Sequence, residues 1–230
     1  MADLPLVKPP WSVLLLGGSS GTGKSTLAPL IARHYGLSWL EADDFRLALQ
    51  RATTPATHPL LHFFLTDDLA IRPDFRQLSA EAFRDGLIAV AEVVSRALEL
   101  VVANHVGQAR SVVLEGDGIL PAMAARRIFS GMDVGNAVRA IFLIEPDLEA
   151  LVANMRKRTS AASVPNAARR NEARASWLYG LWLRQEGLRY GLPVLDVRPY
   201  ETLLSRALRV LPTPPAASVD AGRGVVSPSI

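Results

Sequence analysis

The sequence contains no cysteine, only three lysines and no long apolar run. The absence of cysteine excludes disulfide bonds and thiolate metal sites, and it is typical of cytoplasmic proteins. No run approaches the ~20 apolar residues that cross a membrane, so we predict neither a transmembrane helix nor a membrane partner. Residues 1–8 lack the charged start and long apolar stretch of a secretory leader, and we expect none. A cytoplasmic protein is therefore expected.

Arginine carries nearly all of the positive charge, and the net charge of this 230-residue chain is +3. Arginine favours bidentate contacts with phosphate, although a GC-rich genome would give the same bias, and both explanations stay open. Because 49% of the residues are hydrophobic, the chain is apolar enough to build a substantial core. The basic balance is compatible with a nucleic-acid surface but does not demand one, so we do not expect a nucleic-acid substrate.

A glycine-rich segment, Gly-Ser-Ser-Gly-Thr-Gly-Lys-Ser-Thr, spans residues 18–26 and matches the phosphate-binding loop G-x-x-x-x-G-K-[ST]. The aliphatic run 12–16 before it is suited to a buried strand, and the segment 26–33 after it has apolar residues at helical spacing. Strand, glycine loop and helix in this order distinguish a phosphate loop from a chance match. The segment therefore predicts the binding of a nucleoside triphosphate such as ATP.

Each residue type in this phosphate loop suits the binding of phosphate and of Mg²⁺. Gly18, Gly21 and Gly23 lack a Cβ atom, so the chain can curl with its N–H groups around an anion. The N-terminus of the following helix adds partial positive charge at the same point. Lys24 is expected to reach the β- and γ-phosphates, and the Ser25 hydroxyl to bind Mg²⁺. The expected ATP-binding residues are Gly18, Ser19, Ser20, Gly21, Thr22, Gly23, Lys24, Ser25 and Thr26.

Strand and helix patterns alternate along the chain. Buried-strand patterns cover residues 12–16, 37–42, 111–115, 138–144 and 193–197. Helical patterns cover residues 26–33, 45–50, 75–103, 147–158, 167–188 and 201–211, with Gly86 a point where the long helix could break. Five strands separated by helices predict the three-layer α/β/α fold of phosphate-loop NTPases, with a five-stranded parallel sheet. Ligands are then expected at the carboxyl ends of the strands.

Residues 1–211 are predicted to form one domain, and the proline- and alanine-containing tail 212–230 is predicted to be disordered. A polar segment flanked by arginines, at about 156–174, is the expected helical lid. Lid arginines can neutralise charge on the transferring phosphoryl group and exclude water. Arg158 is the candidate catalytic arginine, with Arg156 as the alternative, although arginine at a helix C-terminus also simply favours the helix dipole.

Two carboxylates, Asp43 and Asp44, follow the second predicted strand. Phosphoryl transfer to an alcohol needs a carboxylate that orients the hydroxyl and accepts its proton, together with cations that bind the acceptor. We assign Asp43 as the catalytic base and Arg46 as an acceptor-binding cation. Aspartate also caps helices well, and we expect one of the two aspartates to cap the next helix.

Glu115 ends the third predicted strand, where nucleotide sites carry a carboxylate associated with Mg²⁺. Ser25 and Glu115 are therefore the predicted magnesium-binding residues. Many strands end in an acid without binding metal, so this assignment depends on the phosphate loop. Asp117 and His62 are further candidates for contacting the acceptor. Backbone groups around residues 196–199, after the fifth strand, are expected to contact the adenine.

The order of these motifs resembles the small-molecule kinases of the phosphate-loop superfamily, which include nucleotide, shikimate and gluconate kinases. Within that group the sequence is most similar to 2-phosphoglycerate kinase, through segments 17–26, 43–46, 59–62 and 112–116. The resemblance covers roughly residues 12–145, and segment 116–118 departs from the sequence, often containing histidine, that is expected there. The resemblance implies Mg²⁺- and ATP-dependent phosphorylation of a small hydroxylated substrate, such as 2-phosphoglycerate or a similar anionic alcohol.

Other functions stay open at this point. A nucleotide-dependent switch or partner-binding ATPase would need a sensor segment or an arginine supplied by an oligomer, and neither is evident in the sequence. A kinase for a nucleoside, an antibiotic or nucleic-acid ends would use much the same residues, and the basic balance supports the last only weakly. The leading expectation is a phosphotransferase with an alcohol acceptor.

Overall fold

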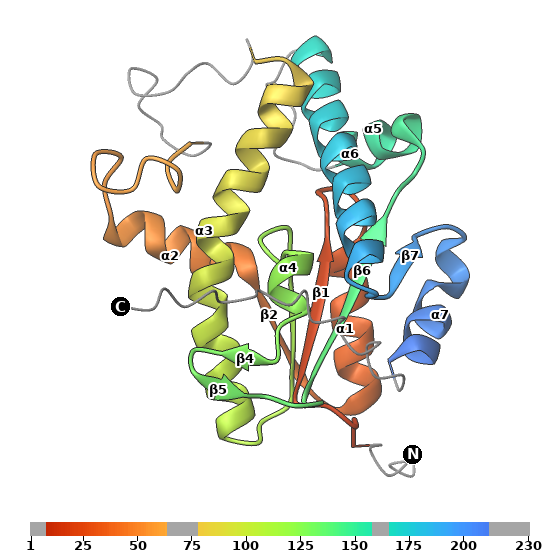
Figure 1. Ribbon diagram of the computed structural model, residues 1–230. Coiled ribbons are helices and arrows are strands. Elements are labelled where there is room, and N and C mark those ends of the chain that lie inside the picture. The colour runs from red at the N-terminus through yellow and green to blue at the C-terminus, as the bar shows by residue number, and fades with distance from the viewer. Residues whose placement is uncertain (1–7, 64–77, 158–165, 212–230) are drawn as a thin grey trace, which may run out of the picture.

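The computed structural model describes residues 8–63, 78–157 and 166–211 (Figure 1). A five-stranded sheet has the order β2-β3-β1-β6-β7, and all of its neighbouring strands are parallel. Each strand overlaps a predicted one, so the predicted α/β fold with a five-stranded parallel sheet is confirmed. The strands are β1 (Val13–Gly18), β2 (Ser38–Glu41), β3 (Val112–Gly116), β6 (Val138–Ile144) and β7 (Val194–Asp196).

Helices cover both faces of this sheet, which gives the three layers that the sequence predicts (Figure 1). On one face, α3 (Ala80–Gly107) packs against α6 (Asn166–Arg189). On the other face lie α1 (Lys24–Tyr35) and α7 (Leu203–Val210). The phosphate loop joins β1 to α1, so it lies at the carboxyl edge of the central strand.

The buried side chains form one layer on each face of the sheet. Leu15 of β1 packs in the layer that contains α3 and α6, while Leu14 and Leu16 pack in the layer that contains α1 and α7. This alternation is the two-residue period of a strand. Because both faces are covered, all residues of β1 are buried, and the strand is a continuous apolar run that ends in glycine.

Two shorter helices begin at the carboxyl edge of the sheet. α2 (Ala42–Ala52) starts directly after β2, so it is longer than the predicted helix 45–50. α5 (Leu148–Arg156) follows β6 and is capped by Asp147, whose carboxylate accepts a hydrogen bond from the Glu149 N–H at 2.8 Å. Both helices therefore start where ligands are expected in such a sheet.

The long helix α3 is continuous through Gly86, contrary to the break that this glycine suggested. The helix begins after Ser79, whose side chain accepts a hydrogen bond from the Ala82 N–H at 3.1 Å. A Cβ atom at position 86 would lie 2.4 Å from Cε1 of Phe63, so the glycine makes room for this ring. Gly86 therefore serves packing and does not end the helix.

Residues 119–137 contain elements that the sequence patterns did not predict. After β3 the chain forms the single-turn helix α4 (Pro121–Ala124) and then an antiparallel hairpin of β4 (Ile128–Phe129) and β5 (Met132–Asp133). Two-residue strands are too short to show a periodic pattern in the sequence. In Figure 1 the hairpin lies beside the C-terminal half of α3, which β4 contacts.

Several predictions concern residues outside the described ranges. They are the loop 66–73, the start of the long helix at Phe75, the catalytic role of Arg158, the polar segment 159–165 and the tail 212–230. Within the described ranges, none of the helices combines the length and the apolar character that crossing a membrane requires.

Gly18, the last residue of β1, has φ of 150°, and a Cβ atom there would lie 2.6 Å from the Leu143 carbonyl oxygen of β6. At Gly23, φ is 86° but a Cβ atom would meet nothing within 4 Å. Because a strand backbone cannot move aside, we expect Gly18→Ala to lower the free energy of unfolding by roughly 1–3 kcal/mol more than Gly23→Ala. Urea unfolding of both variants measures this difference. Equal losses would mean that backbone conformation alone requires glycine at position 18.

Candidate functional site

The phosphate loop is held in shape by its own polar groups. The Thr22 hydroxyl donates to the Ser19 carbonyl at 2.8 Å, and Nζ of Lys24 donates to the same carbonyl at 3.1 Å. Gly21 and Gly23 take left-handed conformations, with φ of 87° and 86°. Lys24 is only 7% exposed, so its charge is directed into the loop rather than into bulk solvent.

Two helices from the second half of the chain anchor this loop from outside. The Asn154 amide of α5 donates to the Gly21 carbonyl at 3.2 Å, and the Ser176 hydroxyl of α6 donates to the Ser20 carbonyl at 2.9 Å. The carbonyls of Ser19, Ser20 and Gly21 are thus all held by protein donors. Helices outside the loop hold the Ser20 and Gly21 carbonyls, whereas Thr22 and Lys24 of the loop itself hold the Ser19 carbonyl.

A large cavity of about 630 Å³ opens beside the phosphate loop. One wall is the loop and α1, and the opposite wall is the end of α5 together with the turn between β7 and α7. This volume lies within the range of cavities that hold cofactors and drug-sized ligands. The residues that line it are Gly21, Gly23, Lys24, Ser25, Thr26, Leu27, Leu30, Asn154, Lys157, Tyr200, Glu201, Leu203 and Leu204.

The predicted adenine contacts at 196–199 do not line this cavity, whose wall begins at Tyr200. The connection between β7 and α7 contributes to this cavity only from Tyr200 onward, and adenine contacts there stay a prediction. Tyr200 is 41% exposed, which is a large exposed fraction for a ring that is fixed by hydrogen bonds. The sequence could have indicated Tyr200 as a cavity residue, because it is an aromatic residue shortly after the last predicted strand, 193–197.

A second and smaller cavity of about 40 Å³, called here the carboxylate cavity, lies on the other side of Lys24. Carboxylates from the ends of β2 and β3 meet there, since Glu41 and Glu115 are partners in the strand register. β3 lies between β1 and β2, so Asp43 is two strands away from the phosphate loop and still reaches its edge. The lining residues are Ser20, Lys24, Ser25, Glu41, Asp43, Glu115, Gly116 and Asp117.

Glu115 is 2% exposed and lies beside the hydroxyl that the sequence assigns to magnesium. Burial raises the pKa of this carboxyl, while a hydrogen bond from Ser25 and the charge of Lys24 act in the opposite direction. Both side chains offer oxygen, the ligand type that Mg²⁺ prefers. Because the described residues contain no cluster of three or more His, Cys, Asp or Glu side chains able to hold a metal, a magnesium ion here would depend on phosphate oxygens as well.

Asp43 lies in the first turn of α2 and contacts both a cation and a second carboxylate. The expectation that Asp43 or Asp44 caps the helix is wrong, because the N-cap residue is Glu41 and no side chain makes the capping bond. Nη2 of Arg46 lies 3.3 Å from Oδ1 of Asp43. Burial and the neighbouring charge of Asp117 raise the pKa of Asp43, and Arg46 and Lys24 counteract them in part.

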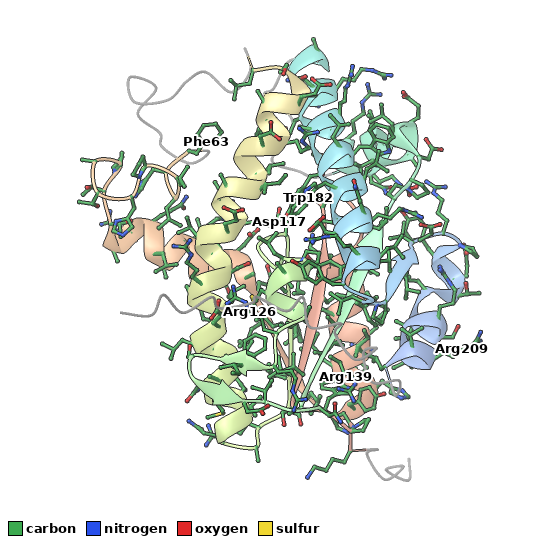
Figure 2. All side chains as sticks on the ribbon, in the orientation of Figure 1. Phe63, Asp117, Arg126, Arg139, Trp182 and Arg209 are labelled. Atoms are coloured by element: carbon green, nitrogen blue, oxygen red, sulfur yellow. The ribbon has the colours of Figure 1, made fainter. Side chains whose placement is uncertain are left out.

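Asp117 connects β3 to the phosphate loop and to α6. The Ser20 hydroxyl lies 3.4 Å from Oδ2 of Asp117, and the hydroxyl of the buried Tyr179 donates to its carbonyl at 2.6 Å. Ser95 of α3 holds the next carbonyl, that of Gly118, at 2.7 Å. In Figure 2, Asp117 accordingly lies between α3 and α6 above the carboxyl edge of the sheet.

The remaining sequence candidates are placed less centrally. His62 lies with Nε2 3.1 Å from the Thr53 hydroxyl and lines neither cavity, so its contact with an acceptor stays a prediction. Arg170 and Arg174, at the C-terminal end of the predicted lid 156–174, pair with Glu149 and with Glu81 on the surface. The candidate Arg158 lies outside the described residues.

Sequence reasoning missed several residues that the structure brings to the site. Glu41 is the last residue of β2 and could have been recognised by the same strand-end rule that identified Glu115. Asn154, Ser176 and Tyr200 carry no motif, because each reaches the site through contacts between distant parts of the chain.

No family model matches this chain. Among curated proteins it is similar to a 2-phosphoglycerate kinase from Methanococcus maripaludis strain C6, with 28% identity over 122 residues. The match covers 51% of this chain and 39% of that protein, so the chain spans about two fifths of the length of the curated relative it matches.

Solved structures with a similar arrangement include small-molecule kinases. A gluconokinase from Sinorhizobium meliloti is 19% identical with a TM-score of 0.44, and the match covers 90% of this chain and 94% of that one. A sugar kinase from a Janibacter species is 22% identical with a TM-score of 0.49, covering 91% and 99%. A shikimate kinase from Acinetobacter baumannii is 14% identical with a TM-score of 0.45, covering 88% and 93%.

Proposed function

We propose that this protein is a kinase that transfers the γ-phosphoryl group of ATP to a hydroxyl group of a small metabolite, with Mg²⁺ bound. One observation supports this most strongly: Lys24 and Ser25 line both the large cavity and the carboxylate cavity. The end of the phosphate loop thus stands between a space of nucleotide size and a group of carboxylates. A phosphoryl group held there has the nucleotide on one side and the acceptor on the other.

The proposed roles follow from this placement. The loop N–H groups and Lys24 bind the β- and γ-phosphates, and the base lies toward Tyr200. Ser25 and Glu115 would hold Mg²⁺, which neutralises charge on the phosphate oxygens when it is bound. Arg46 and Asp117 would contact the acceptor beside Asp43.

In the transfer step, the acceptor hydroxyl oxygen forms a bond to the γ-phosphorus and its proton passes to the Asp43 carboxylate. The bond from the γ-phosphorus to the bridging oxygen breaks, and ADP leaves with the electron pair. Lys24 is positioned to stabilise the charge that develops on the transferring group. Arg158, in the predicted lid, is proposed to act on the same charge.

The acceptor that the sequence resemblance supports is 2-phosphoglycerate or a similar anionic alcohol. Arg46 is a cation near Asp43 that suits a carboxylate or phosphate group on such an acceptor. The alternatives are an acceptor of another class, such as a nucleoside, an antibiotic or a nucleic-acid end, and an ATPase switch that has no acceptor.

Release of ADP by the purified protein tests this function. The assay uses Mg²⁺ and ATP, alone and with 2-phosphoglycerate, glycerate, gluconate, shikimate, nucleosides, hydroxylated antibiotics or an oligonucleotide. A large increase with one acceptor establishes a kinase and identifies its substrate class. Turnover that no acceptor increases would instead favour the ATPase switch.

The raised pKa of Asp43 predicts a pH dependence of transfer. Asp43 must be ionised to accept a proton, so kcat is expected to fall as the pH drops through a pKa that lies above the ordinary carboxyl value. Asp117→Asn removes the neighbouring charge and leaves an amide that can donate to the ionised Asp43 carboxylate, so the pKa of Asp43 should decrease and the acid limb should move to lower pH.

This shift is measured as kcat against pH, across about pH 4–8 at saturating substrates. Asp44→Asn is the matched control, because Asp44 lies in the same helical turn but is exposed and lines neither cavity. Its acid limb should coincide with that of the wild type. An acid limb that Asp117→Asn leaves in place would contradict the proposed coupling of the two carboxyl groups.

A further inference from the structure

Tyr200 forms part of the large cavity wall opposite the phosphate loop. It begins the short 3₁₀ turn Tyr200–Thr202 that leads from β7 into α7. Asn154 and Lys157, at the end of α5, line the same wall. An aromatic ring that is partly exposed on a cavity wall, beside a polar side chain that reaches the loop, suggests a role in ligand binding.

Hydrogen bonds connect this ring to the phosphate loop. The Asn154 amide nitrogen donates to the Tyr200 hydroxyl at 2.8 Å and to the Gly21 carbonyl at 3.2 Å. An amide group has two N–H donors, so both bonds form at once. The Tyr200 hydroxyl in turn donates to Oε2 of Glu145 at 3.2 Å.

The far end of this chain of hydrogen bonds is fixed in the protein. The Glu145 side chain is completely buried, and it also accepts hydrogen bonds from Nε of Arg198 at 2.9 Å and from the Asp147 N–H at 3.2 Å. The Arg198 guanidinium carbon lies 5.6 Å from the centroid of the Tyr200 ring. Both the hydroxyl and the ring of Tyr200 are therefore held in one orientation.

The loop end of the chain is equally restrained, because α5 packs directly against Gly21. A Cβ atom at Gly21 would lie 2.9 Å from Cδ1 of Leu151 and 3.0 Å from Cγ of Met155. Leu151, Asn154 and Met155 lie on one face of α5, at spacings of three and four residues. A shift of Asn154 would thus change the position of Gly21.

We propose that Tyr200 stacks on the base of the bound nucleotide, and that Asn154 is a positioning residue that links this ring to the Gly21 carbonyl of the phosphate loop. This inference rests on the proposed function, since it concerns the same nucleotide site. Glu145 and Arg198 hold the ring without this amide, and the amide holds the loop carbonyl. Removing the ring affects the base, whereas removing the amide affects the phosphates.

Binding of ATP and of inorganic tripolyphosphate to the purified full chain tests the proposal, because tripolyphosphate has no base. Tyr200→Ala should weaken ATP binding by about tenfold more than it weakens tripolyphosphate binding, the loss expected for one base–aromatic stack. Tyr200→Phe keeps the ring and should restore the ratio of the two affinities. Asn154→Ala should weaken both ligands by the same factor, about threefold, as expected for a lost hydrogen bond.

Tyr190→Phe and Asn104→Ala are matched controls. Tyr190 directly follows α6 and Asn104 lies in the last turn of α3. Both are outside the large cavity, and their replacement should leave both affinities unchanged. Thermal unfolding followed by circular dichroism confirms that each variant is folded. If Tyr200→Ala leaves the ratio unchanged, or Asn154→Ala leaves tripolyphosphate binding unchanged, the inference is overturned while the proposed function stands. If the wild type binds neither ligand, both are overturned.

Discussion

Replacing Lys24 with alanine is expected to reduce acceptor-dependent ADP release by about 100-fold or more, the loss typical when a preorganised charge-stabilising group is removed. Lys24, like Ser25, lines both cavities at the end of the phosphate loop, and it is largely buried. Its ammonium group donates to the Ser19 carbonyl, which places it within the curve of the loop. A neutral side chain would leave the transferring phosphoryl group without this charge.

Initial rates of ADP release, with and without the best acceptor, measure the effect of Lys24→Ala. Lys8→Ala is the matched control, since Lys8 is exposed and lines neither cavity. A melting temperature close to that of the wild type excludes unfolding as the cause. Near-full activity of Lys24→Ala would remove the assignment of the phosphate loop as the catalytic centre.

Asp43→Asn is expected to reduce phosphoryl transfer by about 100-fold or more while leaving ATP binding nearly unchanged. The separation follows from the structure, because Asp43 lines the carboxylate cavity but not the large cavity. Asparagine preserves the shape of the side chain and still reaches Arg46, but it cannot accept the proton of the acceptor hydroxyl.

Two measurements on the same Asp43→Asn preparation separate these effects: kcat for the acceptor and the Kd for ATP. Loss of kcat at constant Kd supports the role of Asp43 as the base. Comparable losses of binding and transfer would assign Asp43 a structural or metal-binding role instead.

The sheet and the loop could be predicted from sequence because their signals are local. The central strands β1, β3 and β6 are largely aliphatic runs, and the loop residues 18–26 carry a motif that residue types and their spacing identify. The carboxylates Asp43 and Glu115 were found by the same logic, since they follow strands whose carboxyl ends share one edge. These parts of the fold and the site are confined to short segments, and sequence patterns describe short segments well.

The remaining features depend on contacts between distant segments. The sequence alone predicts a helix break at Gly86, whereas the structure shows that the ring of Phe63 packs where a Cβ atom would lie. The order of the strands, with β3 between β1 and β2, follows from how the helical connections cross the sheet and not from any one strand. Asn154 and Ser176 act on loop carbonyls that lie 133 and 156 residues earlier in the chain, and no local pattern could mark them.

The conformation of the phosphate loop depends on α5 and α6 as well as on the residues of the motif. Its nine residues come from one short stretch, but the donors that hold its Ser20 and Gly21 carbonyls come from the last third of the described chain. A protein that ended after β6 would keep every residue of the motif but would lose the donors Asn154 and Ser176. The motif is therefore a feature of one short segment, whereas the conformation of the loop depends on contacts across the whole domain.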